Sequence, residues 1–256
     1  MSTTTIESVV VLVAMSAAAG VLGCFVAMRR MVLASDALSH VALPGIGAAL
    51  LLRIHPLAGA MAALLFGTLL IWGIERRSRL AVETVIGVVF SAALALGSMM
   101  TSGDELIHAL LGKPTGVTAS EALIVVSASA AVLAFFAVRK REIIVSLISR
   151  DIATSMGIQM RWLDLQFLLA FAATVGLGLR YLGVLLMGSL VIIPAAAARR
   201  IASNLRGMLI VAVSVALVST LAGTWIGTRL GTETGPPIVL VASACLLVTL
   251  LSKARG

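Results

Sequence analysis

An acidic and a basic side chain stand one helical turn apart in a strongly apolar part of the sequence. Asp36 and His40 lie in the segment Ser35-Asp36-Ala37-Leu38-Ser39-His40. Because an α-helix turns once in 3.6 residues, positions i and i+4 face the same way. Ionisable groups at membrane depth are costly and usually face a pathway or the interior of a bundle. A carboxylate oxygen with an imidazole nitrogen is also a reasonable half-site for a divalent transition metal.

The same pair has a structural alternative. Ser35 or Asp36 could cap the start of a helix, with His40 hydrogen-bonded to a neighbour. Spacing alone favours neither interpretation. Pro44 and Gly45 follow directly, and because proline removes a helical hydrogen bond and glycine permits unusual dihedral angles, they predict a bent or interrupted helix. Transporters use such interrupted helices at substrate sites.

A short helix is predicted in the connection at residues 139–162. Asp151 stands near its start and Gly157 provides a natural stop. Apolar side chains recur every four residues along one face, at Ile148, Ile152 and Met156. Such a helix could dock into the groove of a soluble partner. It could instead lie on the lipid surface, and the pattern alone slightly favours that interpretation.

A third group of polar residues lies in the connection at 101–120. Asp104 and His108 could contact a metal if that stretch is helical, with Glu105 beside them. Solvated loop groups are the more economical interpretation of these three side chains. A docking partner on that side could also meet them.

The composition is that of a membrane protein. The chain has 256 residues, of which 60% are hydrophobic and 12% charged, and its mean hydropathy is +1.13. Soluble domains carry roughly 25% charged residues. The apolar runs are continuous, which favours membrane-spanning helices over a barrel whose strands alternate. We therefore predict an all-α polytopic membrane protein.

The basic residues predict the orientation of the spans. Fifteen of the 19 Lys and Arg residues fall on one side if the chain crosses nine times with its N-terminus outside and its C-terminus in the cytoplasm. Eight crossings remain possible, because only residues 180–182 separate the sixth span from the seventh. The predicted spans are 9–28, 36–52, 56–74, 85–100, 121–138, 163–179, 182–198, 207–228 and 236–252.

The chain is predicted to be one transmembrane domain over residues 1–256, because no connection is long enough for a soluble domain. This argues against nucleic-acid binding despite a net charge of +8. No phosphate-binding loop of the form Gly-x-x-x-x-Gly-Lys-Ser/Thr is present, so any ATP hydrolysis must occur on another chain. We predict that the chain is not itself an enzyme.

These motifs together resemble the permease subunits of zinc/manganese/iron ABC importers, over nearly the whole chain. The segment around Asp36 and His40 is the most recognisable signature. The other matching stretches are Arg29-Arg30-Met31, Leu43-Pro44-Gly45, Glu83 to Ser91, Arg150-Asp151 with Ala153 and Gly157, Gly183 to Leu186, Val191 to Ala195 and Gly235 to Leu240.

The resemblance implies a homodimeric membrane core with cytoplasmic ATP-binding subunits and an extracytoplasmic metal-binding protein that delivers the ion. It places Asp36 and His40 at positions that contact metal in the translocation path. It also makes the short cytoplasmic helix a coupling helix in the ATPase cleft. The residues that would form this contact are Arg150, Asp151, Ala153, Met156 and Gly157.

The resulting prediction is a metal-cation ABC importer permease in the bacterial inner or plasma membrane, surrounded by lipid. Mn²⁺, Zn²⁺ or Fe²⁺ would be cargo, and no cofactor would be bound permanently. Two copies of Asp36 and His40 would supply four ligands, enough for a transient site. The alternative is a proton-coupled secondary metal-ion transporter that uses the same pair. A structural subunit without its own substrate path is a third possibility.

Overall fold

The computed structural model describes residues 3–78, 80–100 and 118–251, and within these ranges all regular secondary structure is α-helical. This confirms the predicted all-α class. The helices are α1 (Thr3–Met28), α2 (Val32–Val41), α3 (Leu43–Leu51), α4 (Pro56–Arg77), α5 (Val82–Met100), α7 (Ala119–Ile148), α8 (Arg150–Ser155), α9 (Met160–Ile201), α10 (Leu205–Leu230) and α11 (Gly235–Leu251).

Seven helical segments of the described chain are long and apolar enough to cross a membrane. They are Ile6–Met28, Ala34–Leu51, Pro56–Arg77, Val82–Met100, Ala119–Ile148, Met160–Leu179 and Leu205–Leu230. The helix α11 is also apolar but has only 17 residues. The segment Ala34–Leu51 counts as one crossing although it contains most of α2 and all of α3.

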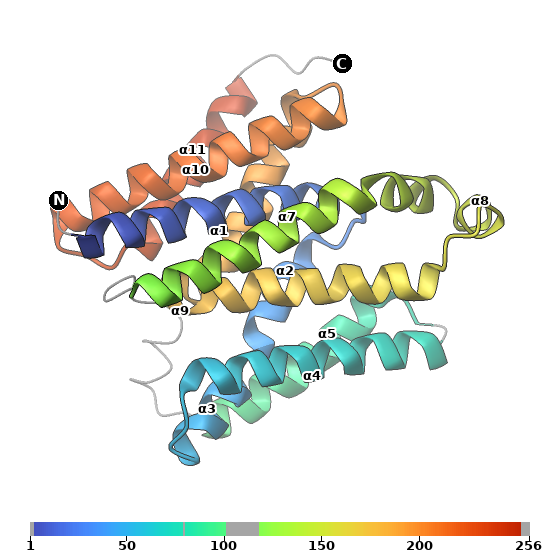
Figure 1. The fold of residues 1–256 in the computed structure, drawn as a ribbon, viewed down its shortest axis with the longest axis horizontal. Coiled ribbons are helices and arrows are strands. Elements are labelled where there is room, and N and C mark those ends of the chain that lie inside the picture. Colours follow the sequence, from blue (N-terminus) through green and yellow to red (C-terminus); the bar gives the residue numbers. More distant parts are fainter. Residues whose placement is uncertain (1–2, 79, 101–117, 252–256) are drawn as a thin grey trace.

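The long helices form a bundle in which α1, α7 and the first half of α9 occupy the middle (Figure 1). Helices α10 and α11 cover one side of this layer, and α3, α4 and α5 cover the other. The helix α2 passes between these groups and packs against α9, α5 and α4. Because α2 carries Asp36 and His40, the candidate site lies among several helices.

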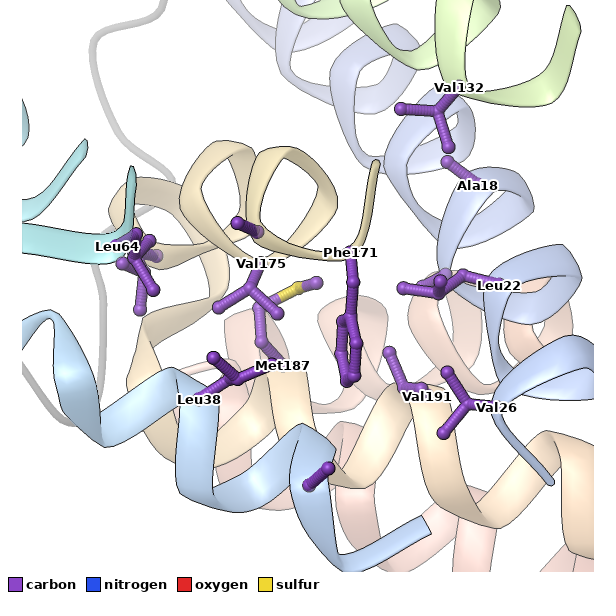
Figure 2. Close-up of a cluster of buried hydrophobic side chains, with 14 of the residues drawn as sticks. Ala18, Leu22, Val26, Leu38, Leu64, Val132, Phe171, Val175, Met187 and Val191 are labelled. Carbon is purple, nitrogen blue, oxygen red and sulfur yellow. The ribbon is translucent and has the colours of Figure 1, made fainter. Parts of the chain in front are cut away.

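The core around α2 is closely packed and apolar. Leu38 of α2 and Met187 of α9 are both fully buried, and Figure 2 shows their side chains near Val175 and Phe171 of α9. Burial of Leu38 fixes which face of α2 is turned toward α9. Side chains of α1, α4, α7 and the second half of α9 complete this cluster in Figure 2, namely Ala18, Leu22, Val26, Leu64, Val132 and Val191.

The helix that carries the site is interrupted, and the interruption precedes the proline. Helix α2 ends at Val41 and α3 begins at Leu43, with Pro44 in the first turn of α3. Proline is tolerated there because the first N–H groups of a helix have no partner within it. Gly45 then lies against Gly59 of α4, so closely that a methyl group on either residue would overlap the backbone of the other.

Helix α9 contains a second break. Its 42 residues would extend for about 63 Å, roughly twice the hydrocarbon thickness of a bilayer. Gly183 interrupts it with φ 78° and ψ 166°. We expected the separation at residues 180–182, and the structure moves it to the adjacent residue because glycine adopts this conformation without a steric penalty.

The contact between Gly45 and Gly59 predicts a specific sensitivity. Gly59→Ala should lower the melting temperature of the detergent-solubilised protein, because overpacking costs about 1–3 kcal/mol and exceeds the helix-propensity gain of about 1 kcal/mol. Gly73→Ala is the matched control on the same helix, since its added methyl group meets nothing within 4 Å. Equal melting temperatures for the two variants would contradict the close contact.

Candidate functional site

Asp36 and His40 face the same side of α2. The Nε2 atom of His40 lies 3.8 Å from Oδ1 of Asp36. Helix α2 begins at Val32, after the N-cap residue Met31, and no side chain caps it. The interpretation of Ser35 or Asp36 as a helix cap is therefore wrong, since both residues lie inside the helix.

The remaining polar residues of α2 are satisfied within the helix. The hydroxyl groups of Ser35 and Ser39 are donated to the carbonyls of Val32 and Ser35, each at 2.8 Å. Both serines can therefore be buried without an unpaired hydroxyl. Ser35 and Ser39 are turned inward, whereas the Asp36 side chain is 55% exposed and the His40 side chain is 17% exposed.

Neighbouring helices position the pair. Gly188 of α9 lies directly on Asp36: a methyl group there would be 3.0 Å from Oδ1 and 3.2 Å from Cα of Asp36. The ring of Phe90, on α5, meets the His40 imidazole edge-on with centroids 5.6 Å apart. The Nδ1 atom of His40 is buried and has no hydrogen-bond partner among the described residues. Sequence reasoning missed Gly188 and Phe90, because contacts between distant helices leave no local pattern.

The geometry of the pair suits a metal-ligand half-site. Two ligands at about 2.1 Å from a tetrahedral metal lie about 3.4 Å apart, so a small side-chain rotation would bring the 3.8 Å pair onto one ion. No group of three or more His, Cys, Asp and Glu side chains within the described ranges is arranged to hold a metal. Within the described ranges, Asp36 and His40 are thus a pair of candidate ligands rather than a complete site.

Residues at both ends define the bounds of the short helix α8. The Ser149 side chain accepts a hydrogen bond from the backbone N–H of Ile152 and caps the start. Gly157 follows the end with φ +82°, a conformation that favours glycine. Asp151 lies in the first turn and Ala153 is fully buried.

The apolar stripe predicted along α8 is exposed to the surroundings. Ile148, Ile152 and Met156 are all exposed large hydrophobic residues. Figure 1 shows α8 at one end of the bundle, away from α2. The structure therefore does not bring the α8 residues together with Asp36 and His40, and any influence between them must pass through intervening helices.

A second group of charged residues lies between α8 and the end of α1. The Oδ1 atom of Asp164, on α9, accepts a hydrogen bond from Nη1 of Arg29 at 2.9 Å, and its Oδ2 atom accepts one from Nη2 of Arg150. Glu75 of α4 lines a cavity together with Arg29, Arg150 and Asp164. Burial lowers the pKa of the Arg29 guanidinium, whereas Asp164 raises it. The Arg29 guanidinium still carries its positive charge, because arginine is not deprotonated in proteins.

Sequence reasoning also missed this group. In the sequence, Arg29 stands out only within the stretch Arg29-Arg30-Met31 of the family resemblance, and Asp164 does not stand out. The available signal was a single carboxylate near the start of an apolar helix, which usually faces the bundle interior. The expected outer-loop residues Asp104, Glu105 and His108 lie outside the described residues.

These features define a multi-pass helical membrane protein with an ionisable pair on an interrupted helix. The chain belongs to the ABC 3 transport family, whose family model matches residues 1–253. This confirms the family resemblance and a location in the cell membrane.

Curated relatives and a solved structure extend the comparison. The chain is 29% identical over 236 residues to the manganese transport system membrane protein MntC of Listeria innocua, covering 91% of this chain and 84% of the relative. It is 27% identical over 247 residues to the high-affinity zinc uptake system membrane protein ZnuB of Buchnera aphidicola, covering 94% of each. A chain of PsaBC from Streptococcus pneumoniae in complex with Fab has the same fold, with a TM-score of 0.85 at 24% identity over 100% of this chain and 93% of that one.

Proposed function

We propose that the chain is the permease subunit of an ATP-driven importer for divalent transition-metal ions, and that Asp36 and His40 contact the ion during translocation. The observation that carries this proposal is the exposed carboxylate beside an imidazole on an interrupted, otherwise uncharged helix. The relatives named for manganese and zinc transport support the same class of cargo. The ligand types suit Mn²⁺, Zn²⁺ and Fe²⁺ alike.

The proposal includes a dimer in which two copies of the pair face one another. One chain offers one oxygen and one nitrogen ligand, whereas Zn²⁺ takes four ligands in most sites. Asp36 is more than half exposed although α2 packs among other helices, which leaves its carboxylate accessible to an ion or a second copy. Four ligands without thiolates form a site from which an ion can also leave.

We further propose nine crossings, with the N-terminus outside and the C-terminus in the cytoplasm. Gly183 supports this count, because it divides α9 into two lengths that could each cross the bilayer. The ends of α1 and α4 lie near the same end of the bundle as α8 in Figure 1, and Arg29, Arg76 and Arg77 occur there. A cytoplasmic location of this end agrees with the positive-inside rule.

In this proposal the energy for transport enters through α8. A separate cytoplasmic ATPase would contact the apolar stripe of α8, since exposed apolar residues on a short helix suit docking in a groove. An extracytoplasmic metal-binding protein would deliver the ion at the opposite end. Closure of the ATPase would then displace α8 and shift the helices around the metal path. The chain itself performs no hydrolysis.

The first test replaces His40. His40→Ala should lower ⁵⁴Mn²⁺ uptake at least about tenfold in cells that carry the whole transport system, because loss of a metal-site group typically costs 10–100-fold. His55→Ala is the matched control, since His55 accepts a hydrogen bond from the backbone of Leu57 at the start of α4. Uptake equal to wild type in His40→Ala at matched expression would refute the site.

The same assay separates the alternative of a secondary transporter. The importer requires ATP and the partner ATPase, and the isolated chain should be inactive. Uptake by the isolated chain in proteoliposomes, driven by a proton gradient, would favour the secondary transporter instead.

A second test displaces Asp36 without changing it. Gly188→Ala places a methyl group against the Asp36 backbone and carboxylate, so metal uptake should fall several-fold, because small displacements of site groups are costly. Gly87→Ala is the control, as its methyl group meets nothing within 4 Å. If both variants transport equally well, the position of Asp36 does not matter for uptake.

A third test addresses α8. Ile152→Glu and Met156→Glu should each reduce copurification of the ATPase at least about tenfold, as expected when a charge enters the apolar centre of an interface. Leu80→Glu is the control, because Leu80 is also exposed but belongs to the connection between α4 and α5. Unchanged copurification would instead support a helix that lies on lipid.

A further inference from the structure

Three separate parts of the chain meet at the Asp164 carboxylate. Its two oxygen atoms accept hydrogen bonds from Arg29, 135 residues earlier, and from Arg150, 14 residues earlier. Arg29 follows the end of α1, Arg150 is the first residue of α8, and Asp164 belongs to α9. The carboxylate is thus the point at which α8 is linked to the beginning of the helix that carries Asp36.

The connection between α1 and α2 is too tight to absorb a displacement of Arg29. The backbone N–H groups of Arg29, Arg30 and Met31 are all hydrogen-bonded to carbonyls in the last turn of α1. Arg30 adopts φ 60°, which is unusual for a residue with a side chain. Met31 is already the N-cap residue of α2. A movement of Arg29 should therefore be passed to α2 rather than lost in a flexible loop.

Arg29 is also held firmly on α9. Its guanidinium lies over the ring of Phe167 at 4.1 Å from the centroid, and its side chain is 11% exposed. Asp164 is 14% exposed, whereas Arg150 is 62% exposed. Exposed ion pairs contribute little to stability, and Arg29 alone already supplies Asp164 with a buried opposite charge. Stability therefore does not account for the link from Arg150 to Asp164.

We propose that Asp164 is a positioning residue that transmits displacement of α8, through Arg150 and Arg29, to the connection between α1 and α2. This inference rests on the proposed function, because it assumes that an ATPase moves α8. In that case Arg150 pulls on one oxygen of the carboxylate while Arg29 follows the other. The start of α2, and with it Asp36 and His40, then moves in step with α8.

The test uses the complete importer, with its ATPase and its extracytoplasmic binding protein, reconstituted in proteoliposomes and supplied with ⁵⁴Mn²⁺. Asp164→Asn and Arg150→Gln should each lower the amount of Mn²⁺ transported per ATP hydrolysed about five-fold. Copurification of the ATPase should be retained in Asp164→Asn, since Asp164 is largely buried. Arg150→Lys should restore part of the ratio, because it returns a positive charge to the link.

The matched control is Glu142→Gln. It removes the ion pair between Arg139 and Glu142, at 2.7 Å, but both partners belong to α7, so no link between elements is lost. In this variant the amount of Mn²⁺ transported per ATP hydrolysed should stay at the wild-type value. An equal loss in this variant would overturn the proposal, because any missing charge at this end of the bundle would then suffice.

The remaining outcomes are distinguishable. An unchanged ratio in both Asp164→Asn and Arg150→Gln would overturn the inference while leaving the proposed function intact. If Asp164→Asn does not accumulate in the membrane, Arg150→Gln decides at matched copurification of the ATPase, because it leaves Arg29 and Asp164 paired. A wild-type complex without ATP-dependent Mn²⁺ uptake would refute the proposed function itself.

Discussion

A carboxylate at membrane depth must be surrounded by protein or water, and this requirement governs the helices around α2. Asp36 cannot face lipid without a large free-energy cost. Helix α2 accordingly runs among α9, α5 and α4. Leu38 is buried on one face of α2, and Ser35 and Ser39 bury hydroxyl groups that are satisfied by the helix itself. The only strongly polar groups left on α2 are those of Asp36 and His40.

The helices around α2 can pack this closely because glycine residues stand at their points of contact. Gly188 allows α9 to lie against Asp36, and Gly45 and Gly59 allow α3 and α4 to touch through their backbones. Small residues serve the same purpose in membrane proteins generally, because apolar attraction between helices is absent in lipid. Helices α2 and α3, which carry these two contacts, meet at Ala42. The glycine contacts and the break thus belong to one arrangement, which fixes the site in place.

The local features of this arrangement could be predicted from the sequence, whereas the contacts between distant segments could not. Continuous apolar runs indicated the helices, and the i, i+4 spacing indicated that Asp36 and His40 share a face. The cap at Ser149 and the left-handed Gly157 delimit α8 near the expected residues. The roles of Gly188 and Asp164 depend on which helices become neighbours in three dimensions. A single sequence carries no period or spacing that specifies those neighbours.

The carboxylates of Asp36 and Asp164 also differ in a way that decides which can receive a cation. Both oxygen atoms of Asp164 accept hydrogen bonds from guanidinium groups, so its charge is compensated and its lone pairs face arginine. Among the described residues, the only basic side chain at ion-pair distance from Asp36 is the His40 imidazole, at 3.8 Å, and the Asp36 side chain is 55% exposed. A divalent cation approaching Asp164 would meet two fixed positive charges, and Coulomb repulsion in a medium of low dielectric constant is strong. Arg29 and Arg150 therefore repel a cation from the Asp164 carboxylate, whereas the Asp36 carboxylate remains open to one.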